Sequence, residues 1–336
     1  MNMMKYETLL NGFFDEMDKV LTHEKKWLKI FGVTFAAVAA AAAGCILAAK
    51  ALHAEEAEYA AVATGILGVI FFILTVKRCI RYFSAVSDSK KLFYRDVYSQ
   101  VVAAELGLEV NCEIELGDYS AKSCGTVHEG RYVTYTGMMD GRPITLGAAA
   151  EYMVTKEKYE VETGKTVSSK SEWVYSPLEF ECGYRGYVTP PVTVKEHELG
   201  EKFVNNHTGL FNKVKRFLGD EDSLEKKNFI SLDDKSFRFA VICDDEVLAY
   251  KTLTPSLTEK IKALDSFASV NSLEFNGDTL TGKSQNTVLD LFYEPSLTGD
   301  MNKNRQNYTA ERVLEEARGA IEKIKKFAAM LPMEIN

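Results

Sequence analysis

The sequence predicts an α+β protein anchored in a membrane, on three observations. Two apolar runs, at 30–49 and 59–76, are separated by a short polar link at 50–58. Apolar residues recur at helical spacing before and after these runs, and from residue 108 onward they alternate as in β-strands. Each run is close to the ~20 residues that an α-helix needs to cross a hydrocarbon core of ~30 Å. We therefore expect a transmembrane helical hairpin over 30–76, followed by a mixed, β-rich soluble domain.

The bulk composition is that of a globular protein with a minor membrane part. Of the 336 residues, 46% are hydrophobic and 26% are charged, and the mean hydropathy is −0.14. The chain is long enough for one large or two small domains with a sizeable core. The net charge of −8 argues against general nucleic-acid binding, which requires a clustered basic face. Six scattered cysteines without a close pair indicate reduced, mostly buried thiols.

Residues 1–29 are expected to form an amphipathic helix. Its acidic residues face an apolar set that recurs at helical spacing: Tyr6, Leu9, Leu10, Phe13, Phe14, Met17, Val20 and Leu21. The stretch is too long and too acidic for the first region of a signal peptide. The segment Ala42-Ala43-Gly44-Cys45 resembles a lipoprotein cleavage site, but it lacks the usual large aliphatic residue and precedes a second apolar run. A hairpin is therefore preferred to a cleaved leader.

Basic residues predict the orientation of the hairpin. Lys19, Lys25, Lys26 and Lys29 lie shortly before the first run, whereas the link carries Lys50 and His53 against three glutamates. Six basic residues follow the second run: Lys77, Arg78, Arg81, Lys90, Lys91 and Arg95. Because positively charged flanks remain on the cytoplasmic side, we expect both termini in the cytoplasm and a loop of about nine residues outside. The cluster after the second run also has the charge to contact anionic lipid head groups.

Small residues recur within both apolar runs and predict close helix packing in lipid. The positions are Ala36, Ala40, Gly44 and Ala48 in the first run, and Ala61, Gly65 and Gly68 in the second. We expect the hairpin to pack on itself, with a structural homo-oligomer of several chains as the alternative. Since no ionisable residue lies in the middle of either run, the sequence gives no support for an ion pathway.

Three further segments complete the expected layout. A juxtamembrane helix over 77–107 should end at Gly107. The α+β domain should occupy 108–300. A C-terminal segment should occupy 301–336, in which a helix starts near Thr309 after a polar link at 298–307.

Strands are expected where β-rich stretches lie between glycines and prolines. These stretches are 110–116, 131–136, 143–146, 171–182, 186–194, 237–243, 273–275, 279–280 and 288–293. The polar run 156–171 suggests a surface hairpin or loop, and 201–218 fits either helix or strand. Thr254 and Pro255 are a good N-cap and first-turn pair for a helix. Asn276-Gly277 is a tight-turn signal.

Four short segments carry a resemblance to a known family: Phe237-Arg-Phe-Ala-Val, Glu246-Val-Leu-Ala, Leu253-Thr-Pro-Ser-Leu and Leu291-Phe-Tyr-Glu-Pro. With the overall layout, they resemble a bacterial domain-of-unknown-function family, number three-one-three-seven. The resemblance implies an N-terminal helix, one closely spaced transmembrane pair and a large α+β domain at the bacterial inner membrane. It implies no catalytic residues.

One motif matches the phosphate-loop pattern GxxxxGK[ST], through Gly277, Gly282, Lys283 and Ser284. In such a loop Lys283 would reach the outer phosphates, Ser284 would hold Mg²⁺, and an acid such as Asp244 or Asp245 would bind the metal. A phosphate loop must leave a strand and open a helix, whereas Asn276-Gly277 favours a hairpin. The hairpin is the preferred interpretation, and a membrane-tethered nucleotide-binding protein is the alternative.

Other chemical groups give weaker signals. His197 and His207 lack the spacing of metal ligands, and no serine or cysteine lies in a nucleophile motif. A basic cluster is interpreted as a solvated face, with a membrane or an acidic partner as the alternative: Lys213, Lys215, Arg216, Lys226 and Lys227. We therefore expect a non-catalytic cytoplasmic domain, without cofactor or metal, that serves as an adaptor or scaffold for a protein partner.

Overall fold

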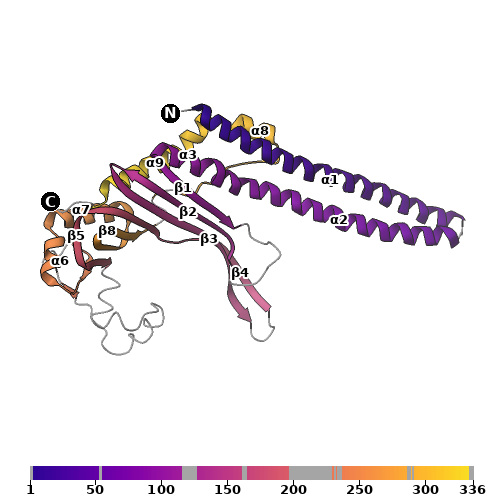
Figure 1. Cartoon of the computed structure of the whole chain (residues 1–336). Helices are drawn as coiled ribbons and strands as arrows, with labels where there is room; N and C mark the ends of the chain where they lie inside the picture. Colours follow the sequence, from indigo (N-terminus) through magenta and orange to yellow (C-terminus); the bar gives the residue numbers. More distant parts are fainter. Residues whose placement is uncertain are drawn as a thin grey trace. The chain divides into compact units, whose positions relative to one another are not determined.

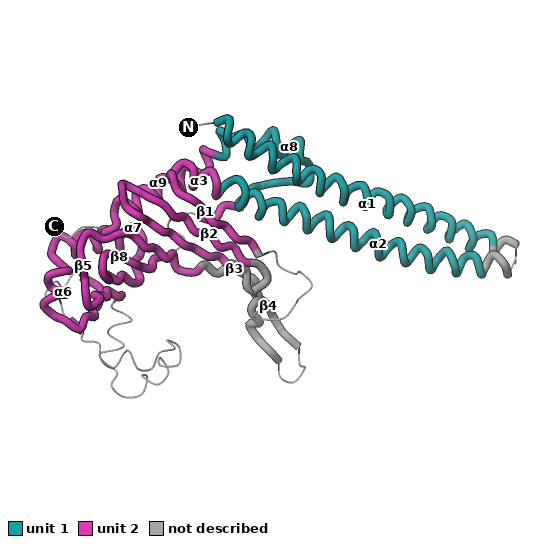
Figure 2. Tube along the Cα trace, viewed as in Figure 1, with its two compact units in different colours: residues 1–98, 294–313 teal, residues 99–293, 314–336 magenta. Residues whose placement is uncertain are grey.

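The computed structural model divides the chain into two compact units (Figure 2). The first comprises Met1–Tyr98 and Glu294–Val313, and the second comprises Ser99–Tyr293 and Leu314–Asn336. The structure describes residues 3–52, 55–115, 127–160, 165–196, 229–230, 232, 237–285, 289 and 291–332. The chain therefore leaves the first unit after the second long helix and returns to it near the C-terminus. The order of segments in the sequence does not suggest this return.

Two long helices form most of the first unit. Helix α1 spans Met3–Leu52 and helix α2 spans Glu55–Phe93, and they lie side by side (Figure 1). At 1.5 Å per residue, the 50 residues of α1 extend about 75 Å, so the expected N-terminal helix and first apolar run are one continuous helix. The link between the runs is shorter than expected, because helix covers all of 50–58 except His53 and Ala54, which lie outside the described residues. Alanine, glutamate, leucine and lysine dominate this link and favour helix.

Each long helix contains a stretch that is long and apolar enough to cross a membrane. In the most apolar 18-residue window of either helix, none of the residues is buried within the structure. Large side chains point outward there, and Val33 and Val62 are 71% and 63% exposed. The core helix of a soluble protein would instead bury such a stretch against its neighbours.

Near the N-terminus of α1, most of the expected amphipathic stripe packs into a small aromatic core, whereas Leu9 is only half-buried and Val20 is exposed. Tyr6, Leu10, Phe13, Phe14, Met17 and Leu21 are all buried. The ring of Phe93 on α2 lies 5.3 Å, centre to centre, from both Phe13 and Tyr308. The stripe therefore holds α1, the end of α2 and residues from near the C-terminus together.

Helix α8, Met301–Asn307, completes the first unit and lies within a stretch expected to be a polar link. Its N-cap is Asp300, whose carboxylate accepts hydrogen bonds from the backbone N–H groups of Asn302 and Lys303. Arg305 of α8 donates to Asp15 of α1 at 2.6 Å and lies over the Phe14 ring. An aspartate before a polar run was thus a helix-start signal that the sequence interpretation missed.

The helix expected over 77–107 ends at Gly107 as predicted, but its first part, 77–93, is a continuation of α2. After α2 the chain forms a π-helical turn, η1, at Tyr94–Tyr98, followed by α3 at Ser99–Leu106. Gly107 then ends the helix with φ of +69°, a left-handed conformation that glycine adopts without strain.

The second unit is built on an antiparallel sheet of eight strands within the described residues, which confirms the α+β class. The order is β1-β2-β3-β5-β7-β6, with β4 paired to β3 and β8 paired to β5. The strands are β1 Leu108–Glu115, β2 Val127–Met139, β3 Arg142–Glu160, β4 Lys165–Tyr175, β5 Leu178–Glu196, β6 Phe229–Ile230, β7 Phe239–Ile242 and β8 Val270–Ser284.

Most expected strands are confirmed, with two corrections. The stretch 171–182 is divided at Ser176 and Pro177 between β4 and β5, while 186–194 continues β5 without interruption. The stretch 288–293 is not a strand where it is described, since buried Leu289 and Leu291 anchor an irregular segment. The polar run 156–171 belongs to the antiparallel pair β3 and β4, in agreement with the expected hairpin. The stretch 201–218 lies outside the described residues.

Besides α3, three helices accompany the sheet in the described part of the second unit: α6 at Glu246–Thr252, α7 at Pro255–Ala268 and most of α9 at Ala310–Met330. The Thr254 side chain accepts a hydrogen bond from the Leu257 backbone N–H, which confirms the expected N-cap. On β5, Leu178, Phe180 and Cys182 are buried while Glu179 and Glu181 are exposed. The ring of Phe180 meets Phe327 of α9 edge-on at 5.1 Å. The sheet thus has one face in the core and one polar face.

Burial of Cys182 and Tyr184 on β5 predicts that alkaline pH weakens the second unit. Burial raises the pKa of the Cys182 thiol from 9.0 to about 12 and that of the Tyr184 phenol from 10.0 to about 12. Between the two values of each group, the unfolded chain releases a proton that the folded chain keeps, so stability falls as pH rises above about 9. The full chain and its Cys182→Ala variant should be compared by denaturant unfolding in mild detergent. The stability advantage of the wild type should narrow from pH 8 to 11; an advantage that stays constant or grows would contradict this account.

Candidate functional site

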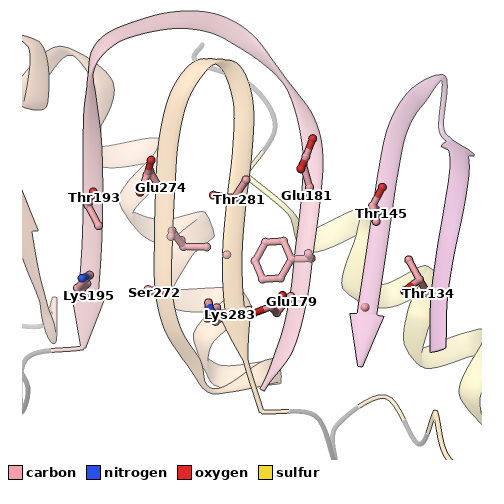
Figure 3. Close-up of a pocket in the computed structure, with 14 residues that line it drawn as sticks. Thr134, Thr145, Glu179, Glu181, Thr193, Lys195, Ser272, Glu274, Thr281 and Lys283 are labelled. Atoms are coloured by element: carbon pink, nitrogen blue, oxygen red, sulfur yellow. Dashed lines mark hydrogen bonds and ion pairs between the residues drawn. The ribbon is translucent and has the colours of Figure 1, made fainter. Parts of the chain in front are cut away.

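Strand β8 turns back on itself inside a wider bend of β5, and side chains on the polar face of the paired arms line a concavity (Figure 3). β8 remains paired with β5 on both sides of the bend: Leu280 opposes Cys182 on one arm and Leu273 opposes Val194 on the other. Gly277, with φ of +60°, lies at the bend. The two arms of β8 lie side by side (Figure 3), and the Gln285 backbone N–H donates to the Ala268 carbonyl at their base, as the turn expected at Asn276-Gly277 requires.

The concavity is a polar groove with a volume of about 580 Å³. Side chains from both arms and from the neighbouring strands β2 and β3 surround it (Figure 3). Its lining is Thr134, Thr145, Gly147, Glu179, Phe180, Glu181, Thr193, Lys195, Ser272, Leu273, Glu274, Thr281, Gly282 and Lys283. We call this set the polar groove.

Strand register explains why these side chains meet. One row runs across the strands from Thr134 through Gly147 and Glu179 to Lys283, since each residue opposes the next. The next row contains Thr145, Glu181 and Thr281. On the other arm, Thr193 opposes Glu274 and Lys195 opposes Ser272. Alternation along each strand then places all of them on the polar face of the sheet.

The groove is rich in charges and hydroxyl groups. Its lining includes three glutamates and two lysines, beside the hydroxyls of four threonines and one serine. Lys283 donates to Glu179 at 2.7 Å, but their side chains are 55% and 65% exposed. Such a surface pair contributes only ~0–1 kcal/mol, so a ligand can replace it at little cost. The groove therefore suits a polar ligand that forms many hydrogen bonds and ion pairs.

The residues of the phosphate-loop motif do not form a phosphate loop. Gly277 through Ser284 lie within β8, whereas a phosphate loop joins a strand to the start of a helix. Lys283 bonds Glu179, and Ser284 is fully buried. The Asp245 carboxylate caps α6 by accepting from Leu248, and Asp244 is exposed after β7 and absent from the groove lining. The geometry thus gives no support for nucleotide binding at these residues.

Core packing accounts for the second glycine of the motif. A Cβ atom added at Gly282 would lie 2.3 Å from the Phe180 Cζ and 2.8 Å from the Leu273 Cδ2. Real Cβ contacts are never so short, and the buried Phe180 ring is itself fixed against Phe327. Gly282 is therefore required because the aromatic ring lies directly over the strand.

The small residues expected at helix interfaces are divided between two surfaces. Gly68 faces Val38 of α1, and Ala48 and Ala61 are half-buried. By contrast, Ala36, Ala40, Gly44 and Gly65 are exposed, and a Cβ added at Gly44 or Gly65 would meet nothing within 4 Å. Only part of the predicted small-residue stripe thus packs within the hairpin.

The histidines and the basic cluster considered as candidate ligands lie outside the described residues. Within the described part, no group of three or more His, Cys, Asp or Glu side chains is arranged to hold a metal ion. The groove residues Glu179, Glu181, Thr145 and Lys195 were not singled out from the sequence. Their only signal was the polar half of the strand alternation, which marks the exposed face without indicating that the sheet bends there.

Comparison of the chain with protein-family models, with curated proteins and with solved structures finds no match.

The packing around Gly282 predicts opposite outcomes for two neighbouring alanine substitutions. Gly282→Ala should destabilise the protein by about 1–3 kcal/mol, because the new methyl group displaces the Phe180 ring. Ser284→Ala should cost less than ~0.5 kcal/mol or should stabilise, since the buried Ser284 hydroxyl has no hydrogen-bond partner within the described residues. Denaturant unfolding of the full chain in mild detergent measures both. Equal losses for the two variants would show that Gly282 is not held by this packing.

Proposed function

We propose that this protein is a two-pass protein of the bacterial inner membrane whose cytoplasmic α+β domain binds another protein through the polar groove. The observation that carries the proposal is the combination of an outward-facing apolar hairpin with a large, polar groove in the attached sheet domain. The resemblance to family number three-one-three-seven remains a prediction, and the proposal does not depend on it.

A cluster of charged and aromatic side chains supports a membrane boundary at one end of the apolar runs. The Arg78 guanidinium bonds Glu24 at 3.2 Å and lies 5.5 Å from the centre of the Trp27 ring. Arg78 also lies over Phe31, at 5.9 Å. Tryptophan and arginine are typical of the interface between lipid and water. From Trp27 to Leu52 α1 extends about 38 Å, which is enough to cross a hydrocarbon core of ~30 Å.

The chemistry of the polar groove supports a protein segment as the ligand. Pockets for small molecules and cofactors are predominantly apolar, with few polar groups. In this groove, five charged side chains and five hydroxyl groups are among the residues of the lining. A polar, extended peptide segment offers backbone groups to the hydroxyls and charged side chains to the glutamates and lysines. Recognition of a protein is therefore preferred to the binding of a cofactor.

Photo-crosslinking in living cells tests the proposal. A photoreactive amino acid placed at Thr145 or Thr281, inside the groove, should give a covalent adduct with one partner protein, identified by mass spectrometry. The controls are Glu259 on α7 and Glu322 on α9, which are exposed and lie outside the groove lining. Adding Glu181→Lys should lower the yield at Thr281 about tenfold, because charge reversal opposes a complementary partner. Equal adducts at all four positions, or none in the groove, would contradict partner binding there.

A further inference from the structure

Two charged side chains of the polar groove, Lys195 on β5 and Glu274 on β8, have no partner of opposite charge. Both line the groove, and both are half-buried. They occupy diagonal positions on paired strands, because Lys195 opposes Ser272 while Glu274 opposes Thr193. Within the described residues, neither charged group forms a hydrogen bond or an ion pair, either with the other or with a third side chain. An ammonium and a carboxylate are thus both left for a ligand.

Thr193 adds a third unsatisfied group beside this pair. The residue is only 7% exposed and lines the groove, and its hydroxyl forms no hydrogen bond within the described part of the chain. Its oxygen keeps contact with the groove, since it is not sealed in the core as the hydroxyls of Tyr184 and Ser284 are. Largely buried hydroxyls are normally satisfied by protein, ligand or water. Thr193 therefore points to a polar ligand at this place.

Neighbouring charges show that pairing is usual in this part of the sheet. Arg238 bonds Glu196, the residue after Lys195, at 2.6 Å, and it bonds Asp265 at 2.5 Å. Across the groove, Lys283 bonds Glu179 at 2.7 Å. A half-buried charge without a partner has lost part of its hydration and has gained nothing in exchange. A ligand that supplies both missing charges would remove this cost.

The spacing of the two charges matches an extended peptide. Diagonal neighbours on paired antiparallel strands lie ~7–8 Å apart. Side chains two residues apart on an extended segment lie on one face at a separation of ~7 Å. Figure 3 shows Glu274 and Glu181 on either side of Thr281, and Glu181 likewise forms no ion pair within the described residues. A basic side chain of the ligand would therefore meet two carboxylates, and an acidic one would meet Lys195.

We propose that the polar groove recognises an extended segment of the partner in which a basic and an acidic side chain are two residues apart. Glu274, together with Glu181, binds the basic side chain, and Lys195 binds the acidic one. The hydroxyl of Thr193 bonds a backbone group of the segment. The inference rests on the proposed function, because it defines the chemistry of the segment that the same groove would bind.

Selection from random peptides tests this rule without knowledge of the partner. Twelve-residue random peptides displayed on phage are selected against the full-length chain in phosphatidylcholine nanodiscs, whose neutral lipid does not attract charged peptides. Arg or Lys two positions from Asp or Glu should become at least about fivefold more frequent than in the unselected library. Glu274→Gln should abolish the enrichment of the basic residue, and Lys195→Gln that of the acidic residue. The matched control is Glu259→Gln on α7, outside the groove lining, which should change neither.

A double-mutant cycle then measures the contact with Glu274. One selected peptide is synthesised, and its binding is followed by fluorescence anisotropy. Glu274→Gln should weaken binding of this peptide about tenfold, but should weaken a peptide whose basic residue is replaced by glutamine by less than about twofold. Denaturant unfolding of each variant verifies that the sheet domain is intact.

The outcomes separate this inference from the proposed function. Selected peptides without the paired charges, or equal weakening of both peptides by Glu274→Gln, would overturn the inference and leave partner binding by the groove standing. Failure to retain any peptide above the level of empty nanodiscs would count against both.

Discussion

Exposure of the apolar middle of the α1–α2 hairpin to water would carry a large cost in free energy. This cost determines the environment in which the hairpin can be stable. Burial of one large apolar side chain is worth about 1.5–3 kcal/mol, so the outward-facing valines, isoleucines and phenylalanines represent on the order of tens of kcal/mol. Both helices satisfy their backbone groups internally, as a span in lipid requires.

The sheet domain presents a polar concavity on one face and packs its core on the other. The bend of β5 and β8 depends on Gly277 at its turn and on Gly282 beneath the Phe180 ring. On the core side, Phe180 is held by Phe327 of α9; on the polar side, its neighbours Glu179 and Glu181 project into the groove. Alternation along one strand therefore links the packing of the core directly to the position of the groove charges.

The sequence allowed the helices and strands to be predicted better than the way they combine. Helical spacing identified the buried stripe from Tyr6 to Leu21, and capping chemistry identified Thr254, because both signals are local. The turn at Asn276-Gly277 was expected because its signal is local, whereas the pairing of the two arms of β8 with the two halves of β5 depends on residues far apart in the sequence. The groove was not foreseen, because Glu179, Lys195 and Thr281 come together through long-range register. Gly282-Lys283-Ser284 resembles a phosphate loop in sequence, but glycine is required at 282 because the Phe180 ring lies against its backbone.

The most direct test of the central claim, a sheet domain held at the cytoplasmic face by a membrane hairpin, is the topology of the full chain in cells. Single cysteines placed at His53 between the helices, at Glu113 on β1 and at Glu322 on α9 can be treated with a thiol reagent that does not cross the inner membrane. In intact spheroplasts the reagent should label only position 53, and after lysis it should label all three. Labelling of positions 113 and 322 in intact spheroplasts, or release of the protein from membranes by carbonate, would contradict the account.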